Sequence, residues 1–221
     1  MAVSESPFRR DARHPNLVLT RHPLLRHKVT LLRRADTPKK IFKELVDEIA
    51  MLLAYEVTAD LVTETVEVRT PLEETEGEIV VGERLTLVPV LRAGLGMVEG
   101  VLQLIPTMRV GHIGLQRDHD TLEPIDYYFK IPPDPEGSLF IVTDPMLATG
   151  GSASAAVTFL KRSGAREIRL MCIVAAPEGV ARMERHHPDV PVYAAAFDRQ
   201  LNEKGYILPG LGDAGDRLFG T

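Results

Sequence analysis

The sequence contains a single cysteine and no tryptophan among its 221 residues. One cysteine excludes a disulfide framework and a zinc site built on CxxC pairs. Because Cys172 lies in an apolar run, we expect it to be a small buried core residue. No apolar run reaches the roughly 18 residues that span a bilayer, and the N-terminus lacks the apolar segment of a secretory signal. These absences predict a cytoplasmic protein without a membrane partner.

Three common site signatures are also missing. No GxxxxGK[ST] motif is present, which disfavours hydrolysis of nucleoside triphosphates. The glycines at 94, 96 and 100 differ by one residue from the dinucleotide fingerprint, which disfavours a nicotinamide site. The seven histidines show no HxxxH or HExxH spacing, and the adjacent His186 and His187 cannot easily face one ion from a helix. We therefore predict no metal held by protein ligands alone.

What is present fits one globular domain over residues 1–221, with 44% hydrophobic and 26% charged residues. The net charge is −5, yet residues 1–40 hold ten Lys/Arg against three Asp/Glu. The basic part, residues 1–37, is interpreted as an N-terminal arm with a solvated or subunit-facing surface. Its only interleaved aromatic residue is Phe8, so no nucleic-acid partner is expected. The sequence assigns no role to residues 1–15.

Hydrophobic periodicity predicts alternating helices and strands. A Thr-Pro pair at 37–38 is typical of a helix start, with Thr37 as the cap, and apolar residues at helical spacing follow to about Tyr55. Residues 63–69 predict a half-exposed strand. Four apolar segments predict strands that are buried on both faces of a sheet, namely 85–91, 138–143, 168–174 and 191–197. Helices are expected at 153–162 and 179–186. This order predicts an α/β fold with a mainly parallel sheet covered on both faces, and ligands beyond the carboxyl ends of its strands.

One strand-to-helix loop has the character of a phosphate site. It comprises nine residues: Asp144, Pro145, Met146, Leu147, Ala148, Thr149, Gly150, Gly151 and Ser152. The main-chain N–H groups at its end open a helix of small residues, where the helix dipole favours an anion. Glycine allows close approach, two hydroxyl groups add donors, and the leading carboxylate can accept hydrogen bonds from sugar hydroxyls. A structural Gly-rich turn is the competing interpretation of the TGGS segment alone.

This loop, with the strand before it, resembles the 5-phosphoribosyl 1-pyrophosphate (PRPP) loop of uracil phosphoribosyltransferases. Many phosphoribosyltransferases have two adjacent acids here, whereas Pro145 follows Asp144, as in the uracil enzymes. The resemblance covers nearly the whole chain from Arg21 and implies a type I phosphoribosyltransferase fold with a hairpin arm and a C-terminal base-binding hood. It also implies that Asp144 contacts the ribose hydroxyls and that residues 149–152 hold the 5-phosphate.

Two arginines are expected to bind the pyrophosphate of PRPP. Arg92 follows the covered strand 85–91 and precedes glycines that permit a tight turn. Residues 117–131 predict a hairpin or lid that carries Arg117, with a plain exposed hairpin as the alternative. His119 in this segment gives only a weak sign of acid/base chemistry. Guanidinium groups can stabilise a leaving pyrophosphate without a proton transfer, and the resemblance assigns both arginines to it.

The C-terminal segment 198–221 combines glycines with apolar side chains and is interpreted as an ordered loop packed on the sheet. Its motif GYI-x-PGLGDAGD resembles the uracil-binding segment of the same family. The resemblance implies that the base is held by Tyr206, Ile207 and the backbone of Gly212, Asp213 and Ala214. Asp213 is also assigned to the PRPP side, as a base or as a positioning group. A structural turn capped by Asp213 and Asp216 is the alternative.

The predicted reaction converts uracil and PRPP to UMP and pyrophosphate, with Asp213, Arg117 and Asp144 as catalytic residues. PRPP carries its own leaving group, so no protein nucleophile is needed, and Mg²⁺ is expected to bind through PRPP. Resemblance further suggests a GTP effector and a homo-oligomer, dimer or tetramer. Two alternatives stay open, namely a phosphoribosyltransferase for another base and an RNA-binding pyrimidine regulator on the same fold.

Overall fold

A computed structural model describes residues 8–10, 12–80, 84–117 and 124–221. Its main sheet has the strand order β1-β2-β12-β11-β9-β5-β7-β8. Neighbours from β2 to β7 run parallel, whereas β1 and β8 are antiparallel at the two edges. The strands are β1 (Phe8–Arg10), β2 (Leu17–Thr20), β5 (Leu85–Leu91), β7 (His112–Arg117), β8 (Pro124–Lys130), β9 (Leu139–Thr143), β11 (Glu167–Ala175) and β12 (Val192–Phe197). Two short strands extend it, β6 (Arg109–Val110) beside β5 and β10 (Met146–Leu147) beside β11. The predicted mainly parallel sheet is confirmed.

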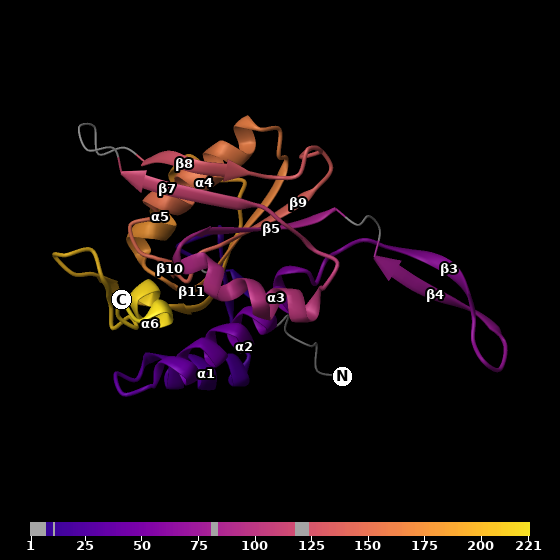
Figure 1. The fold of residues 1–221 in the computed structure, drawn as a ribbon, viewed down its shortest axis with the longest axis horizontal. Coiled ribbons are helices and arrows are strands. Elements are labelled where there is room, and N and C mark those ends of the chain that lie inside the picture. Colours follow the sequence, from indigo (N-terminus) through magenta and orange to yellow (C-terminus); the bar gives the residue numbers. More distant parts are fainter. Residues whose placement is uncertain (1–7, 11, 81–83, 118–123) are drawn as a thin grey trace.

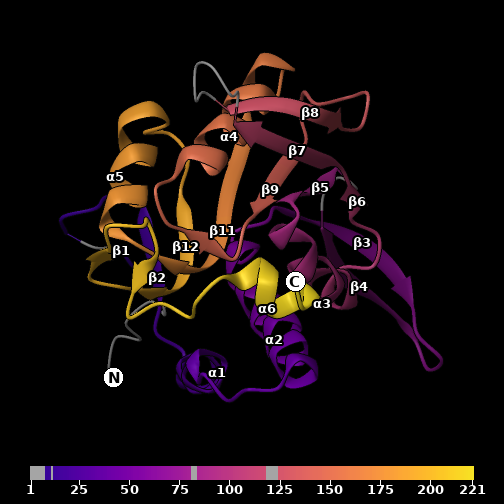
Figure 2. The ribbon, with the colours of Figure 1, turned by 60° about the vertical axis from the view of Figure 1, so that its left-hand side comes forward.

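Helices cover both faces of this sheet (Figures 1 and 2). One face carries α1 (Pro23–Arg33), α2 (Lys39–Val57), α3 (Val98–Leu104) and α6 (Ala214–Phe219), and the other carries α4 (Gly151–Arg162) and α5 (Pro177–His186). Strand β9 shows the reason for its continuous apolar sequence. Leu139 and Ile141 join the core beneath α2, while Phe140 and Val142 join the core beneath α4. Because side chains alternate across a strand, both layers require apolar residues.

The basic N-terminal segment, interpreted from the sequence as an arm with a solvated or subunit-facing surface, packs into the fold from residue 17 onward. Strand β2 pairs in parallel with β12, and Leu17 is fully buried. Helix α1 buries Leu25, Val29 and Leu32 against α2. These residues recur at spacings of four and three, so α1 is an amphipathic helix. Arg26 on its other face is exposed, whereas Arg33 at its end is half-buried. Thr37 does not cap α2, since its hydroxyl donates to the carbonyl of Leu31 and Pro38 occupies the cap position.

Strand β3 (Thr63–Arg69) forms as predicted but lies outside the main sheet. It pairs only with β4 (Glu74–Val80), a strand that the sequence analysis did not predict. The hairpin projects from the body of the molecule (Figure 1). Val66 is the one half-buried residue of β3, and the rest are exposed. The strand is therefore exposed on both faces, because no helix or second sheet packs against the hairpin.

The C-terminal tail is ordered and returns to the side of the sheet that carries α2. It forms the short hairpin β13 (Gln200–Leu201) and β14 (Ile207–Leu208), then α6. Ile207, Leu211 and Leu218 are at least 96% buried and belong to the core cluster of α2. Among the described residues, no helix combines the length and apolar character needed to cross a bilayer.

Candidate active site

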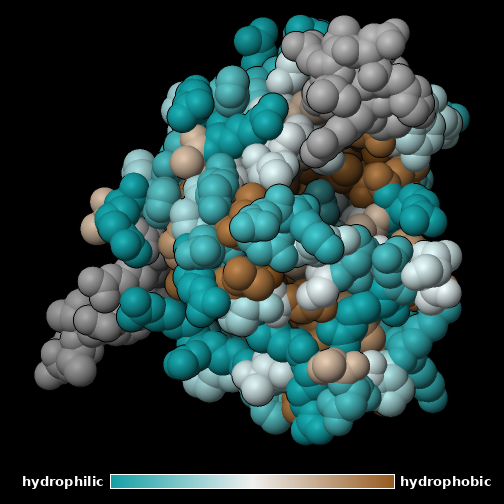
Figure 3. Space-filling view, turned by 90° about the vertical axis from the view of Figure 1, so that its left-hand side faces the viewer, coloured by the Kyte–Doolittle hydropathy of each residue, from teal (hydrophilic) through white to brown (hydrophobic). Residues whose placement is uncertain are grey.

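Two segments predicted to bind substrate meet in one pocket at the carboxyl ends of the strands. The loop after β9 contributes Asp144, Met146 and Ala148, and the C-terminal tail contributes the opposite wall. The tail residues that line it are Gly205, Tyr206, Ile207, Gly212, Asp213, Ala214 and Gly215, with Ala93 from the turn after β5. Figure 3 shows the face with this edge of the sheet, where hydrophobic atoms lie in a hollow surrounded by hydrophilic ones. The geometry therefore brings the predicted phosphate loop and the predicted base segment together.

Asp144 is the titratable group most strongly perturbed in this pocket. It directly follows β9 and retains partial exposure. Desolvation by the surrounding chain nevertheless raises the pKa of its carboxyl to about 7, and the N–H of Met146, 3.4 Å from Oδ1, only partly offsets this. A carboxyl with a pKa near neutrality and few internal partners can accept hydrogen bonds from a ligand at little cost.

The phosphate loop has the backbone geometry of an anion site. Gly150 caps α4 with a φ of 72°, a left-handed conformation that glycine adopts without strain. No side chain caps the helix, so main-chain N–H groups of its first turn face outward without helical partners. Thr149 is exposed, and its hydroxyl is 3.4 Å from the N–H of Gly151. The nine-residue loop thus ends in main-chain donors at the start of a twelve-residue helix, and the one from Gly151 has only a long 3.4 Å bond to Thr149.

Arg92 lies beside the pocket rather than in its lining. It follows β5, is exposed, and its guanidinium carbon lies 6.0 Å from the centre of the Phe219 ring. The glycines behind it serve close packing. A Cβ on Gly94 would overlap the carbonyl oxygen of Thr143, and one on Gly96 would lie 2.5 Å from Leu218 of α6. The turn is therefore shaped by the contacts of β9 and α6, and neither glycine has a positive φ.

The predicted lid is only partly within the described structure. Strands β7 and β8 form an antiparallel hairpin, with a register shift at Gly114 and Leu115. The backbone of Arg117 ends β7, but its side chain lies outside the described residues. His119 and the rest of residues 118–123 also lie outside them. The extended hairpin is confirmed, and the contact between Arg117 and pyrophosphate stays a prediction.

The tail residues reach the pocket in different ways. Asp213 is exposed and caps α6, with its Oδ1 3.0 Å from the N–H of Asp216. Gly212 has a φ of 82°, which turns the chain into that cap. Tyr206 is 46% exposed, whereas Ile207 is 3% exposed and also belongs to the core. Asp213 therefore combines the capping role considered as an alternative with a position at the pocket wall.

A buried ion pair that the sequence analysis missed holds the tail in place. The guanidinium of Arg33 makes two hydrogen bonds of 2.7 Å to the carboxylate of Asp198, which directly follows β12. The same arginine donates to the carbonyl of Gly210, and Asp198 accepts from the N–H of Gly210. Arg217 adds bonds to the carbonyls of Leu32, Arg34 and Leu211. The only sequence signal is an Asp at the end of a covered strand.

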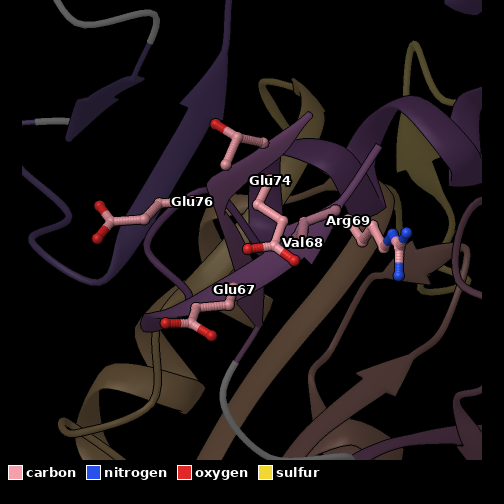
Figure 4. A pocket seen from close by; sticks show the side chains of 6 residues that line it. Glu67, Val68, Arg69, Glu74 and Glu76 are labelled. Carbon is pink, nitrogen blue, oxygen red and sulfur yellow. The ribbon is translucent and has the colours of Figure 1, made fainter. Parts of the chain in front are cut away.

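A second pocket lies on the projecting hairpin, apart from the loop after β9 and the C-terminal tail. Its lining comes from β3 and β4 alone, with three glutamates, one arginine, Val68 and Thr75. Figure 4 shows Arg69 and Glu76 extending to opposite sides, so the charged groups do not converge. Among the described residues, no three His, Cys, Asp or Glu side chains gather as a metal site.

Comparison with known proteins identifies the family. The family model described as uracil phosphoribosyltransferase matches residues 18–221. The chain belongs to the uracil phosphoribosyltransferase family. It is 57% identical to the uracil phosphoribosyltransferase of Listeria innocua over 93% of this chain and 99% of the relative. It is 58% identical to that of Bacillus pumilus over 90% of this chain and 96% of the relative.

Solved structures share the fold of this chain. The AQ2163 protein of Aquifex aeolicus superposes with a TM-score of 0.86 at 38% identity, over 92% of this chain and 97% of that one. A purine phosphoribosyltransferase of Pyrococcus horikoshii, at 15% identity, shares the fold with a TM-score of 0.50 over 71% and 85% of the two chains. The predicted phosphoribosyltransferase fold, the uracil family and the pentosyltransferase class are thereby confirmed.

Proposed function

We propose that the chain converts uracil and PRPP to UMP and pyrophosphate, a step of pyrimidine salvage, in the pocket shared by the loop after β9 and the C-terminal tail. The observation that carries this proposal is the joint lining of the pocket by Asp144 on one side and residues 205–215 on the other. A transfer between two substrates needs both reacting atoms in one place, because orientation supplies much of the rate. The family membership supplies the reaction itself.

In this proposal the loop binds the phosphorylated ribose. The uncapped first turn of α4 receives the 5-phosphate, with the hydroxyls of Thr149 and Ser152 as further donors. Pro145, Met146, Leu147 and Ala148 carry the chain from Asp144 to that turn. The carboxylate of Asp144 accepts hydrogen bonds from ribose hydroxyls. Desolvation by burial raises the pKa of this carboxyl to about 7, and hydrogen bonds from the hydroxyls of PRPP would favour its charged form.

The tail binds the base. Uracil is neutral and offers two carbonyl acceptors and an N3–H donor, which main-chain groups of Gly212 and Ala214 can match. Tyr206 and Ile207 supply apolar surface beside the ring. None of the described lining residues is Lys or Arg, so the carboxylate of orotate would lack a cation. This lining favours uracil over the charged pyrimidine.

The chemistry needs no covalent intermediate with the protein. Uracil N1 bonds to the anomeric carbon as the bond from that carbon to the pyrophosphate oxygen breaks. Asp213 lies on the tail where it can position N1 or accept its proton, while Arg92 and Arg117 supply positive charge for the leaving pyrophosphate. Exclusion of water by the bound substrates protects PRPP from hydrolysis.

Mg²⁺ fits this site as an ion that arrives with PRPP. The pocket is bordered by two carboxylates, Asp144 and Asp213, rather than by a cluster. Mg²⁺ retains several waters and favours substrate phosphates with one or two carboxylates. When bound it would neutralise charge on the pyrophosphate. Asp144 and Asp213 are the side chains available to hold it through water or directly.

The test follows labelled uracil into UMP with PRPP and Mg²⁺. Orotate, hypoxanthine and adenine serve as alternative bases, and UMP formation from uracil alone is the expected result. Asp144→Ala and Arg117→Ala should each lower kcat/KM by roughly 10²-fold or more, since each removes a charged contact to the reacting substrate. An active preference for a purine base, or wild-type rates in both variants, would contradict the proposal.

A homo-oligomer is also proposed, as a dimer or tetramer. The hairpin β3–β4 exposes Leu72, Val68, Ile79 and Val80 to solvent. Isolated two-stranded hairpins are marginally stable, so a partner surface would stabilise it. Light scattering of the full chain and of a form with residues 64–79 replaced by a short Gly-Ser turn should give an oligomer and a smaller species. An unchanged mass would exclude the hairpin from assembly.

Activation by GTP and location in the cytoplasm stay predictions from the sequence. Initial rates at fixed uracil and PRPP, with and without GTP, test the first. Fractionation of cells that express the protein tests the second. RNA binding is expected to be negligible at moderate salt, because net positive charge is confined to the first 40 residues.

A further inference from the structure

Helix α5 packs directly on the phosphate loop through two glycines. A Cβ on Gly179 would lie 2.6 Å from the carbonyl oxygens of both Leu147 and Ala148. A Cβ on Gly150 would lie 2.8 Å from the carbonyl oxygen of Gly179. Real Cβ atoms do not approach backbone this closely, so only glycine permits the contact. The first turn of α5 therefore has a fixed position against the loop.

This contact directs Arg182 toward the start of α4. Residues three apart share a helix face, so Arg182 lies on the same side of α5 as Gly179. The Cβ of Arg182 is 3.3 Å from the position that a Cβ on Gly150 would occupy. Its Nη1 and Cζ are 3.7 and 4.0 Å from the corresponding position on Gly151, and the Thr149 hydroxyl is 3.6 Å from it. A guanidinium and a hydroxyl thus converge on one point at the helix N-terminus.

The charge of Arg182 is not used within the described structure. Some arginines there have carboxylate partners, as Arg33 has in Asp198, Arg109 in Asp134 and Arg169 in Asp60, but that pairing is not general. Arg182 is exposed and makes no hydrogen bond or ion pair to any described residue. Two nearby acids of α5 are engaged elsewhere, since Glu178 accepts from the N–H of Leu201 and Glu184 pairs with His14. A free guanidinium beside uncapped main-chain donors is suited to a phosphate dianion.

We propose that Arg182 is a phosphate-binding residue that adds a side-chain cation to the main-chain donors of residues 149–152. This inference rests on the proposed function, since the ligand group is the 5-phosphate of PRPP and of UMP. That phosphate keeps its charge and bonding throughout the transfer. Arg182 therefore contributes equally to ground state and transition state, and its loss weakens binding without slowing the bound complex.

The test compares Arg182→Gln and Arg182→Lys with the wild type, and Arg185→Gln is the matched control. Arg185 is an exposed arginine in the last turn of the same helix. We expect Arg182→Gln to raise KM for PRPP by roughly tenfold, as for a lost hydrogen bond to a charged group. KM for uracil and kcat should stay within about twofold of wild type. Lysine should restore part of the affinity, and the control should behave as wild type.

A second measurement separates phosphate binding from a structural role. Inhibition by UMP and by ribose 5-phosphate should weaken in Arg182→Gln by the same factor as KM for PRPP, while inhibition by uridine, which lacks the phosphate, should not change. Equal losses for UMP and uridine, or a wild-type KM for PRPP, would overturn the inference. A wild-type protein that makes no UMP would instead refute the proposed function, so the two failures are distinguishable.

Discussion

Replacing Arg33 with methionine should weaken uracil binding, because Arg33 does not line the pocket but holds the C-terminal tail that does. The side chain of Arg33 is 22% exposed and that of Asp198 is 6% exposed, so the pair is largely removed from water. Methionine keeps similar length and loses the charge and all donors. Three hydrogen bonds disappear at once, two to Asp198 and one to the carbonyl of Gly210. Among the described residues, the carboxylate of Asp198 then keeps the N–H of Gly210 as its one hydrogen-bond donor.

The magnitude follows from the burial of that carboxylate. Removing one partner of a buried ion pair costs about 3 to 5 kcal/mol, because the remaining charge is buried without compensation. Partial exposure of Arg33 places the expected loss of unfolding free energy near the lower end, at about 3 kcal/mol. Because Gly210 lies between Ile207 and Gly212, a displaced tail should also lower kcat/KM for uracil on the order of 10²-fold.

The assay is a double-mutant cycle with Arg33→Met, Asp198→Asn and the combined variant. Urea unfolding gives the stability of each, and initial rates give the KM values for uracil and PRPP separately. Asparagine can still accept from the N–H of Gly210, so the combined variant should be more stable than the sum of the single losses by about 1 to 3 kcal/mol. The loss in activity should appear mainly in KM for uracil, because the clamped segment is the base wall.

The neighbouring pair Arg34–Asp36 provides the control. It has the same residue types, with Arg–Asp hydrogen bonds of 2.9 and 2.7 Å, but both side chains are more than 60% exposed. Because Asp36 is exposed, removal of Arg34 leaves no buried carboxylate without a partner. Arg34→Met should therefore leave the free energy of unfolding and both KM values unchanged. Two results would refute the idea that the Arg33–Asp198 pair holds the tail in place. One is additive losses of unfolding free energy in the double-mutant cycle, and the other is an equal increase in KM for uracil and for PRPP. Similar effects of Arg33→Met and Arg34→Met would refute it as well.

Two further predictions concern the loop and the helix packing. Since burial raises the pKa of Asp144 to about 7, the ligand-free protein should lose stability as pH rises from about 4 to about 7, by up to about 4 kcal/mol. Asp144→Asn should flatten that part of the urea-unfolding profile while lowering kcat/KM, and an unchanged slope would contradict the burial of this charge. Gly100→Ala should destabilise the protein by roughly 1 to 3 kcal/mol, because its Cβ would overlap the carbonyl oxygen of Asp47. Gly77→Ala on the exposed hairpin is its control in thermal unfolding, since the added Cβ would lie 3.0 Å from a methyl group of Val68 and near no backbone atom, and equal shifts would exclude the clash.

The elements that the sequence predicted best are those with a dense local signal. Strands β5, β9 and β11 are largely apolar because helices cover both faces, with Glu167 and Arg169 near the start of β11 as the charged exceptions, and α2 has an uninterrupted helical period. Helix α1 was not predicted because its buried leucines are interspersed with arginine and histidine. The high charge of the segment obscured the helical spacing of its apolar residues. Strand β4 was missed because four of its residues are glutamate or glycine and none is buried.

The site shows the same division. The loop after β9 and the tail motif were each recognisable from contiguous residues, and the pocket unites them as expected. The ion pair of Arg33 and Asp198 joins residues 165 positions apart, and nothing near either residue marks the other as its partner. Arg182 likewise lies beside the phosphate loop only because Gly179 of its helix packs closely against Gly150.

The sequence by itself determined the parallel core, the anion-binding turn and the family. Each of these depends on residues adjacent in the chain or on the regular spacing of apolar residues. Only the tertiary structure decided which distant groups share a surface: the arginine that holds the base segment in place and the arginine beside the phosphate turn. Contact between distant segments depends on how helices and strands pack against one another. The residues near one partner in the sequence therefore do not identify the other partner.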